Sequence, residues 1–398
     1  MAAIPLLGAA LVSVSAVVPS GVPELLVAED GSKVESVSRW EGVRRGEILE
    51  FYRDQVYGRR PVQRPPHLVF SQACPDRVMM GGAARRKRIR VEYGGSHGTN
   101  SFSFVAFLPT AAHGPAPSFV FICNRDPAKN IDPERVQKSG FWPAEEIVRR
   151  GFAAIAFFNG EVTPDICHGK RLGAFAAFED VDRQYRALDG WGALSCWAWG
   201  ASRVMDWIET EPALDAKHVA VIGHSRGGKT ALVAAAEDRR FAMACSNCSG
   251  CGGAKLHHID LPGSECLRLS CRIKNFWYCP HYVEWVNRDR EMPYDQHEFL
   301  ALLAPRLLCV GSATEDAHAG PPGEYWSARL ASPAWELYGR KGLVSDAFPP
   351  PETPLQEGSV SYHLRTGKHD LTPYDWGVYM DFAVRHGWIS ENQRKAKE

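Results

Sequence analysis

The chain has 398 residues, of which 45% are apolar and 23% are charged, and this composition is typical of a folded globular protein. Its 46 basic residues are balanced by 46 acidic residues, which excludes an electrostatic footprint for nucleic acid or another polyanion. The eleven cysteines are too few for a disulfide scaffold, and their odd number leaves at least one thiol free or intermolecular.

The chain begins with an apolar leader. Residues 2–18 carry no charge, and residues 14–16 (Val-Ser-Ala) form a small-residue pattern that a signal peptidase accepts, although a positive segment before the apolar run is missing. We therefore predict a signal peptide over residues 1–20 and a secreted or periplasmic protein, with a membrane anchor or a mere apolar leader as the alternatives. No later stretch is apolar over enough residues to span a membrane, and residues 393–398 are predicted to be a polar tail.

Short apolar runs alternate with helical patterns through the rest of the chain. The predicted strands are residues 101–109, 118–124, 152–158, 218–223, 241–247 and 306–313, and the clearest predicted helices are residues 197–210 and 228–239. The later strands are continuous apolar runs, as expected for strands that are covered on both faces. The alternation predicts an α/β fold with three layers, in which helices cover both faces of a mostly parallel sheet. Because we find neither an internal repeat nor a long linker, we expect one domain over residues 21–392.

The strongest local signal follows the predicted strand 218–223. Gly223, Ser225 and Gly227 form a Gly-x-Ser-x-Gly pattern between that strand and the next helix. This context predicts a nucleophile elbow, in which small residues on both sides of the serine permit a strained turn that exposes its hydroxyl. The backbone N–H of Arg226, at the start of the helix, would then face a developing oxyanion.

A nucleophilic serine requires a base and an acid, which in this arrangement follow it in the order acid, then histidine. His369 lies in a turn after an apparent strand and is predicted to be the base, whereas His363 lies inside that strand and is predicted to be structural. The acid should follow a strand, and the strand 306–313 is followed by Glu315 and Asp316. Either carboxylate would hold the imidazole tautomer and stabilise the imidazolium.

The sequence resembles the glucuronoyl esterases, carbohydrate esterase family 15, and especially their bacterial branch. The matching segments are residues 45–61, 191–207, GHSRGGKTAL at 223–232, CSGCGGAKL at 248–256, 295–297, 313–324 and YHLRTGKHDLTPYDW at 362–376. The Ser-Arg-x-Gly-Lys elbow is far more specific than a generic Gly-x-Ser-x-Gly. The resemblance implies a single α/β-hydrolase catalytic domain that cleaves the ester between 4-O-methyl-glucuronic acid of glucuronoxylan and lignin alcohols. It implies no metal and no organic cofactor, and we expect a monomer.

The resemblance also implies roles for individual residues. Ser225 is the nucleophile and His369 the base, and Arg226 stabilises the oxyanion through its backbone and its guanidinium group. Lys229, one helical turn after the serine, is expected to hydrogen-bond sugar hydroxyls. Glu265 is expected to do the same, although its placement crosses an apparent two-residue insertion.

The chain departs from the family pattern at two positions. The family often places its catalytic acid just before Ser-Gly-x-Gly-Gly, where this chain has Cys248. Bacterial members can place an acid after the later strand, so we assign the acid to Asp316, with Glu315 as the alternative. Many members have a sugar-stacking tryptophan two residues after that aspartate, where this chain has His318, which is expected to pack on or hydrogen-bond the uronate.

A cluster of cysteines raises a different interpretation. Cys245, Cys248 and Cys251 are spaced by three residues, with His257 and His258 nearby, and this combination is chemically suited to zinc. A redox pair is a second possibility. Because the cysteines lie inside a segment that resembles the esterase family, we favour buried thiols or one disulfide.

Two functional alternatives also stay open. An acetylxylan esterase or another carbohydrate esterase would use the same scaffold, but the cationic Arg226 and Lys229 favour an oxygen-rich uronate over a neutral acetyl group. A binding protein that has lost catalysis is the other alternative, because the usual acid and tryptophan are absent.

Overall fold

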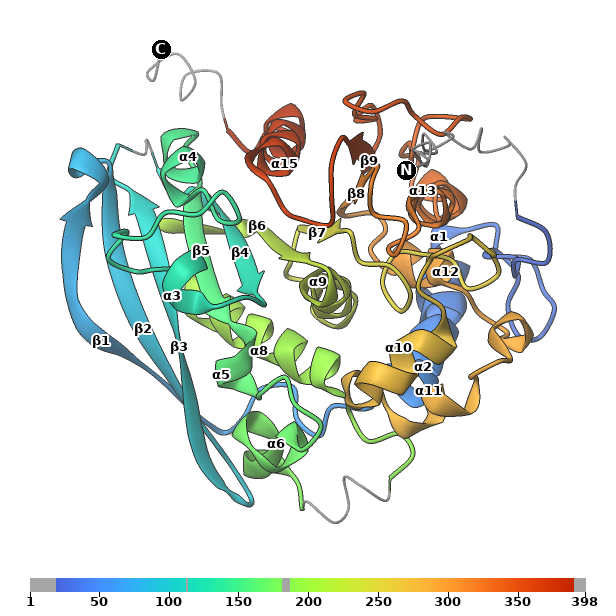
Figure 1. Cartoon of the computed structure of the whole chain (residues 1–398), viewed down its shortest axis with the longest axis horizontal. Helices are drawn as coiled ribbons and strands as arrows, with labels where there is room; N and C mark the ends of the chain where they lie inside the picture. Colours follow the sequence, from blue (N-terminus) through green and yellow to red (C-terminus); the bar gives the residue numbers. More distant parts are fainter. Residues whose placement is uncertain (1–18, 112–113, 181–186, 390–398) are drawn as a thin grey trace, which may run out of the picture.

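Figure 1 shows the computed structural model, which describes residues 19–111, 114–180 and 187–389. Most of the predicted signal peptide and the whole polar tail lie outside these residues, and the limits of the predicted domain stay a prediction. No helix in the described part of the chain is long and apolar enough to cross a membrane.

The described strands form one nine-stranded sheet in the order β1-β2-β3-β5-β4-β6-β7-β8-β9. Their bounds are β1 His67–Met79, β2 Ala84–Gly95, β3 Gly98–Pro109, β4 Ala116–Cys123, β5 Ala153–Phe158, β6 Leu214–His224, β7 Met243–Asn247, β8 Leu307–Ala313 and β9 Val360–Arg365. β1, β2 and β3 pair antiparallel and join β5 antiparallel, whereas the pairings from β5 through β4 to β9 are parallel. The predicted α/β fold with a mostly parallel sheet is therefore confirmed.

Helices cover both faces of the sheet, which gives the predicted three layers (Figure 1). α4 (Ala144–Arg149) and α15 (Pro373–Arg385) lie on one face, and α8 (Ala193–Ile208) and α9 (Arg226–Glu237) lie on the other. A hydrophobic core lies on each face of the sheet, and alternate residues of β6 point into the two cores. Val219 and Val221 pack with α8 and α9, while Ala220 and Ile222 pack with α15. Two-sided burial explains why the parallel strands are continuous apolar runs.

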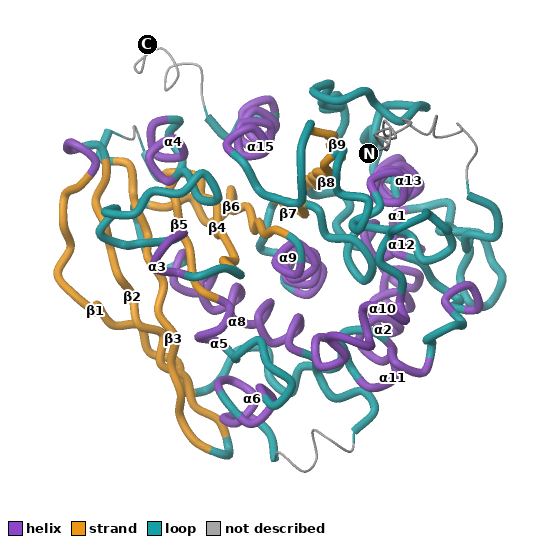
Figure 2. Tube along the Cα trace, in the orientation of Figure 1, coloured by secondary structure: helices purple, strands orange, loops and turns teal. Residues whose placement is uncertain are grey.

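The remaining helices flank the sheet and its loops, and among them α5 and α6 contact β3 while α13 contacts β8 and β9 (Figure 2). They are α1 Val37–Arg39, α2 Arg45–Gln55, α3 Pro127–Asn130, α5 Asn159–Val162, α6 Gly173–Phe178, α10 Leu267–Lys274, α11 Pro280–Glu284, α12 Gln296–Ala301, α13 Pro321–Leu330 and α14 Pro333–Glu336. In a parallel sheet the carboxyl ends of the strands meet at one edge, where binding and catalytic groups usually lie. Here the loops after β4 to β9 meet around the start of α9.

Candidate active site

Ser225 lies at a sharp turn between β6 and α9. Its backbone has φ 56° and ψ −123°, a strained conformation for a residue other than glycine. The Ser225 N–H donates to the carbonyl oxygen of Asn247 at the end of β7, at 2.8 Å, which fixes the turn to the neighbouring strand. A Cβ atom on Gly223 would lie 2.1 Å from the carbonyl oxygen of Gly227, so the turn requires glycine there. This geometry is that of the nucleophile elbow predicted from the sequence.

His369 and Asp316 form a hydrogen-bonded pair at the same edge of the sheet. His369 Nδ1 lies 2.5 Å from Asp316 Oδ2, and the side chains are 38% and 2% exposed. Burial alone would raise the pKa of Asp316, but the hydrogen bond and charge of His369 and the N–H of Ala319 outweigh burial and hold that pKa below its usual value. The carboxylate is therefore ionised and fixes the imidazole through Nδ1, which leaves Nε2 for another partner. Glu315, the alternative acid, is exposed.

A buried ion pair holds the loop that carries His369. Arg365 donates from Nη2 to the carbonyl oxygens of the residues before and after His369, at 2.6 and 2.7 Å. Its Nε donates to Asp375 Oδ2 at 2.9 Å, and His363 Nε2 lies 2.8 Å from the other oxygen of Asp375. His363 is fully buried in this network, which is the structural position expected from the sequence.

A second histidine, His224, packs against His369 and was not predicted as a site residue. The two ring centroids are 4.4 Å apart, and His224 Nδ1 donates to Asn247 Oδ1 at 2.6 Å. Burial and the neighbouring His369 lower the pKa of His224 to about 3, so its ring stays neutral. A neutral neighbour adds no charge that would oppose protonation of His369. Because His224 immediately precedes Ser225, this contact also places His369 beside the elbow.

The Arg226 guanidinium is fixed by loops from two other strands. Its Nη2 donates to the carbonyl oxygen of Asn124, after β4, at 2.6 Å, and its Nε lies 2.6 Å from Asp165 Oδ2, in the loop after β5. Trp277 Nε1 donates to the other oxygen of Asp165 at 2.7 Å, and the Trp277 ring lies 5.9 Å from the guanidinium carbon. We did not predict Asn124 and Asp165 as site residues, although Asn124 ends the predicted strand 118–124 and Asp165 lies seven residues after the predicted strand 152–158.

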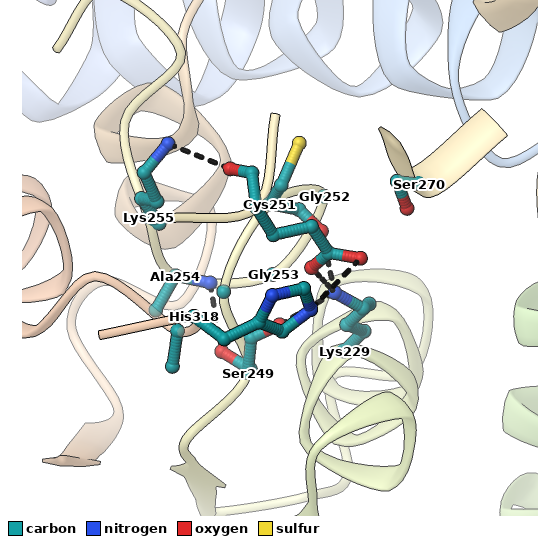
Figure 3. A network of polar contacts seen from close by, with 12 residues as sticks. Lys229, Ser249, Cys251, Gly252, Gly253, Ala254, Lys255, Ser270 and His318 are labelled. Atoms are coloured by element: carbon teal, nitrogen blue, oxygen red, sulfur yellow. Dashed lines mark hydrogen bonds and ion pairs between the residues drawn. The ribbon is translucent and has the colours of Figure 1, made fainter. Parts of the chain in front are cut away.

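Lys229 is buried one helical turn after Ser225 and points from α9 toward the loop after β7 (Figure 3). Its Nζ donates to the carbonyl oxygens of Ser249 and Cys251 at 2.6 and 2.5 Å and to Glu265 Oε2 at 3.0 Å. An ammonium group has three protons, so all three are used by the protein. Lys229 therefore holds Glu265 and the loop after β7, and its expected contact with sugar hydroxyls stays a prediction.

Glu265 and His318 lie side by side above Lys229. The Glu265 N–H donates to the His318 carbonyl oxygen at 2.7 Å, and His318 Nε2 lies 4.0 Å from Glu265 Oε1. The His318 side chain is 55% exposed, so this position faces solvent where the family pattern has tryptophan. The two side chains present an acceptor and an imidazole next to the elbow, both suited to hydroxyl groups.

Within the described residues, the three cysteines of the run do not gather into the zinc site that was the alternative interpretation. Cys245, Cys248 and Cys251 are buried free thiols, and no disulfide joins them. His257 Nδ1 and His258 Nδ1 instead lie 3.0 and 2.9 Å from the two oxygens of the aspartate that caps α12. Both histidines therefore bind a buried carboxylate, and His257 also faces Cys251.

Comparisons with known proteins agree with this fold and geometry. A family model described as "Glucuronyl esterase, fungi" matches residues 98–339. Carbohydrate esterase MZ0003, from an unknown prokaryotic organism, is 33% identical over 92% of this chain and 89% of its own length. A 4-O-methyl-glucuronoyl methylesterase of Podospora anserina is 27% identical over 78% of this chain and 59% of its own length. The solved structure of a glucuronoyl esterase from Solibacter usitatus is 34% identical, with a TM-score of 0.84, and the match covers 92% of this chain and 97% of that one.

Proposed function

The chain belongs to the glucuronoyl esterase family, carbohydrate esterase family 15, and we propose that Ser225, His369 and Asp316 are its catalytic triad. As a member of this family it is a carboxylic ester hydrolase of the 4-O-methyl-glucuronoyl methylesterase type. The observation that carries the triad assignment is the 2.5 Å contact between His369 Nδ1 and the buried Asp316, beside a serine in a strained elbow.

The proposed reaction has two halves. His369 Nε2 removes the hydroxyl proton of Ser225 as its Oγ attacks the carbonyl carbon of the uronate ester, and Asp316 stabilises the imidazolium that forms. The tetrahedral oxyanion is stabilised by the Arg226 N–H and guanidinium, and the alcohol leaves with the proton from His369. Water then attacks the glucuronoyl-enzyme, again through His369, and releases the uronic acid and the free serine.

Substrate recognition rests on groups around the elbow. Glu265 Oε1 and His318 are placed to hydrogen-bond sugar hydroxyls, and Lys229 acts through Glu265 by holding its other oxygen. The Arg226 guanidinium keeps partial exposure although it pairs with Asp165, so it can approach the uronate oxygens. We assign the alcohol side of the ester to lignin, which makes a lignin–carbohydrate ester of glucuronoxylan the natural substrate.

We further propose that the enzyme acts as an exported monomer. Ser225, Asp316 and His369 all come from one chain, so catalysis requires no second copy. The apolar leader supports export to the periplasm or the cell exterior, where plant polysaccharide occurs.

Hydrolysis of benzyl glucuronate, measured beside release of acetate from acetylated xylan, tests the substrate assignment. We expect turnover of the uronate ester and little release of acetate. Turnover of acetyl esters alone would contradict the uronate assignment and favour an acetylxylan esterase on the same scaffold. Inactivity on both, without labelling of Ser225 by a fluorophosphonate probe, would favour a binding protein without catalysis.

A further inference from the structure

Cys248 completes a group of three metal-ligating side chains at the triad. Cys248, Asp316 and His369 each offer a ligand atom, and these atoms all lie within 4.8 Å of one another. The three residues follow β7, β8 and β9, which are neighbours in the sheet. The Cys248 N–H donates to the carbonyl oxygen of Gly311 in β8 at 2.7 Å, so the thiol has a fixed position beside the Asp316–His369 pair.

From this arrangement we infer that Cys248, Asp316 and His369 bind a thiophilic divalent metal ion such as zinc, and that the ion reversibly inhibits the esterase. A thiolate, an imidazole and a carboxylate are the three side-chain ligands that zinc uses in proteins. Bonds of about 2.0 to 2.3 Å to a tetrahedral zinc place ligand atoms about 3.3 to 3.8 Å apart, so shifts of about 1 Å would suffice. The ion displaces the thiol proton, which passes to solvent, while the proton on His369 Nδ1 moves to Nε2, so that the ring binds the ion as a neutral imidazole.

The surroundings of Cys248 favour a cation over oxidation. Cys248 is 1% exposed and lies beside the buried Asp316. Burial keeps bulk oxidants away from the thiol. The ionised Asp316 attracts a divalent cation, and the exposed ring of His369 gives the ion a path from solvent.

Inhibition follows from the identity of the ligands and rests on the proposed function. An ion bound to His369 and Asp316 separates the acid from the base and prevents His369 from accepting the Ser225 proton. The ion takes no part in ester hydrolysis, so the metal-free enzyme is the active form. Metal binding itself depends on Cys248 and is independent of the substrate.

The first experiment measures ester hydrolysis against zinc chloride in a buffer that does not chelate metal, with each variant compared to its own metal-free rate. We expect zinc to lower the wild-type rate more than about tenfold and EDTA to restore it. Cys248→Ala should weaken the apparent affinity for zinc at least about 100-fold, because a direct ligand is lost. Cys167→Ala, which removes an exposed thiol elsewhere, should retain wild-type inhibition. Equal inhibition of wild type and Cys248→Ala would overturn the proposal.

The second experiment detects binding without any ester. Cobalt(II) added to the wild type and to Ser225→Ala should produce a thiolate-to-cobalt absorption band with a stoichiometry of one ion per chain. Cys248→Ser, checked for folding by circular dichroism, should lack the band. A band that persists in a chain inactive on every ester would support the metal site and refute the proposed function. Absence of the band from active wild type would refute the site alone.

Discussion

Replacement of Asp316 by asparagine removes the charge that orients His369 and leaves the shape of the side chain unchanged. An amide can donate a proton to Nδ1, which the carboxylate cannot do. The imidazole would then carry its proton on Nε2 and could not accept the hydroxyl proton of Ser225. The variant thus removes general-base catalysis with no change in packing volume at a side chain that is 2% exposed.

The magnitude follows from the contact that is lost. His369 Nδ1 and Asp316 Oδ2 are 2.5 Å apart and the carboxylate is ionised, so a charge-assisted hydrogen bond is replaced by one of the wrong polarity. The wrong tautomer lowers kcat by about 10,000-fold in triads of this kind. At about 1.36 kcal/mol for each factor of ten, the transition state loses about 5.5 kcal/mol of stabilisation. KM should change much less, because Asp316 lies behind the imidazole.

The assay is kcat for benzyl glucuronate at saturation, with Glu315→Gln as the matched control. Glu315 is adjacent in sequence but exposed, so the kcat of Glu315→Gln should stay within about twofold of wild type, as for most surface substitutions. Adding Cys248→Glu to Asp316→Asn should recover part of the activity, because position 248 lies within reach of His369. An Asp316→Asn variant within about tenfold of wild type, or a large loss in Glu315→Gln, would refute the assignment of the acid.

Three further predictions concern the oxyanion and the buried charges. Arg226→Ala should lower kcat about 100- to 1,000-fold, and a loss below about tenfold would show that the guanidinium contributes little. Burial raises the pKa of Glu324 from 4.5 to about 7, so the folded state favours the neutral carboxyl group. The free energy of unfolding therefore falls as the pH rises from 4.5 through about 7. Between these pH values the free energy of unfolding of the wild type should fall by about 3 kcal/mol, measured by urea unfolding, and that of Glu324→Gln should not. An equal dependence of the free energy of unfolding on pH in wild type and variant would contradict this. Asp375→Asn should destabilise the fold by about 3 to 5 kcal/mol, because it breaks a buried pair with Arg365. Burial would raise the pKa of Asp375, but His363 and Arg365 outweigh burial and lower it. The contribution of Asp375 to the free energy of unfolding is therefore present above pH 3.8 and is lost as the pH falls below that value. An unchanged melting temperature of Asp375→Asn at about pH 7 would refute the prediction.

Local sequence predicted the elbow because the residues that the turn itself requires, Gly223, Ser225 and Gly227, lie within five positions. Gly223, Ser225 and Gly227 meet their constraints through contacts with one another and with the adjacent strand. The choice between Glu315 and Asp316 could not be made from spacing, because both follow the same strand. Burial and the hydrogen bond to His369 distinguish them in the structure.

The features that the sequence did not predict depend on distant segments. Lys229 lies where the elbow motif indicates, but the carbonyl oxygens that saturate its Nζ come from residues 20 and 22 positions later. Asp165 meets Arg226 from a different loop, 61 residues earlier in the chain. We did not predict β1 and β2 from the sequence, because β1 is largely exposed and β2 carries several arginines, so neither is a continuous apolar run.

Measurement of kcat/KM for benzyl glucuronate in wild type and in Ser225→Ala, with EDTA in the buffer, tests the role of the serine most directly. We predict clear turnover by the wild type and a loss of at least about 10,000-fold in the variant, because the acyl-enzyme cannot form. The variant should melt at the wild-type temperature or above it, because alanine is no larger than serine and adopts the same backbone conformation, with φ 56°, at no greater cost. Hydrolysis by Ser225→Ala within about tenfold of wild type would show that another group attacks the ester and would contradict the central claim.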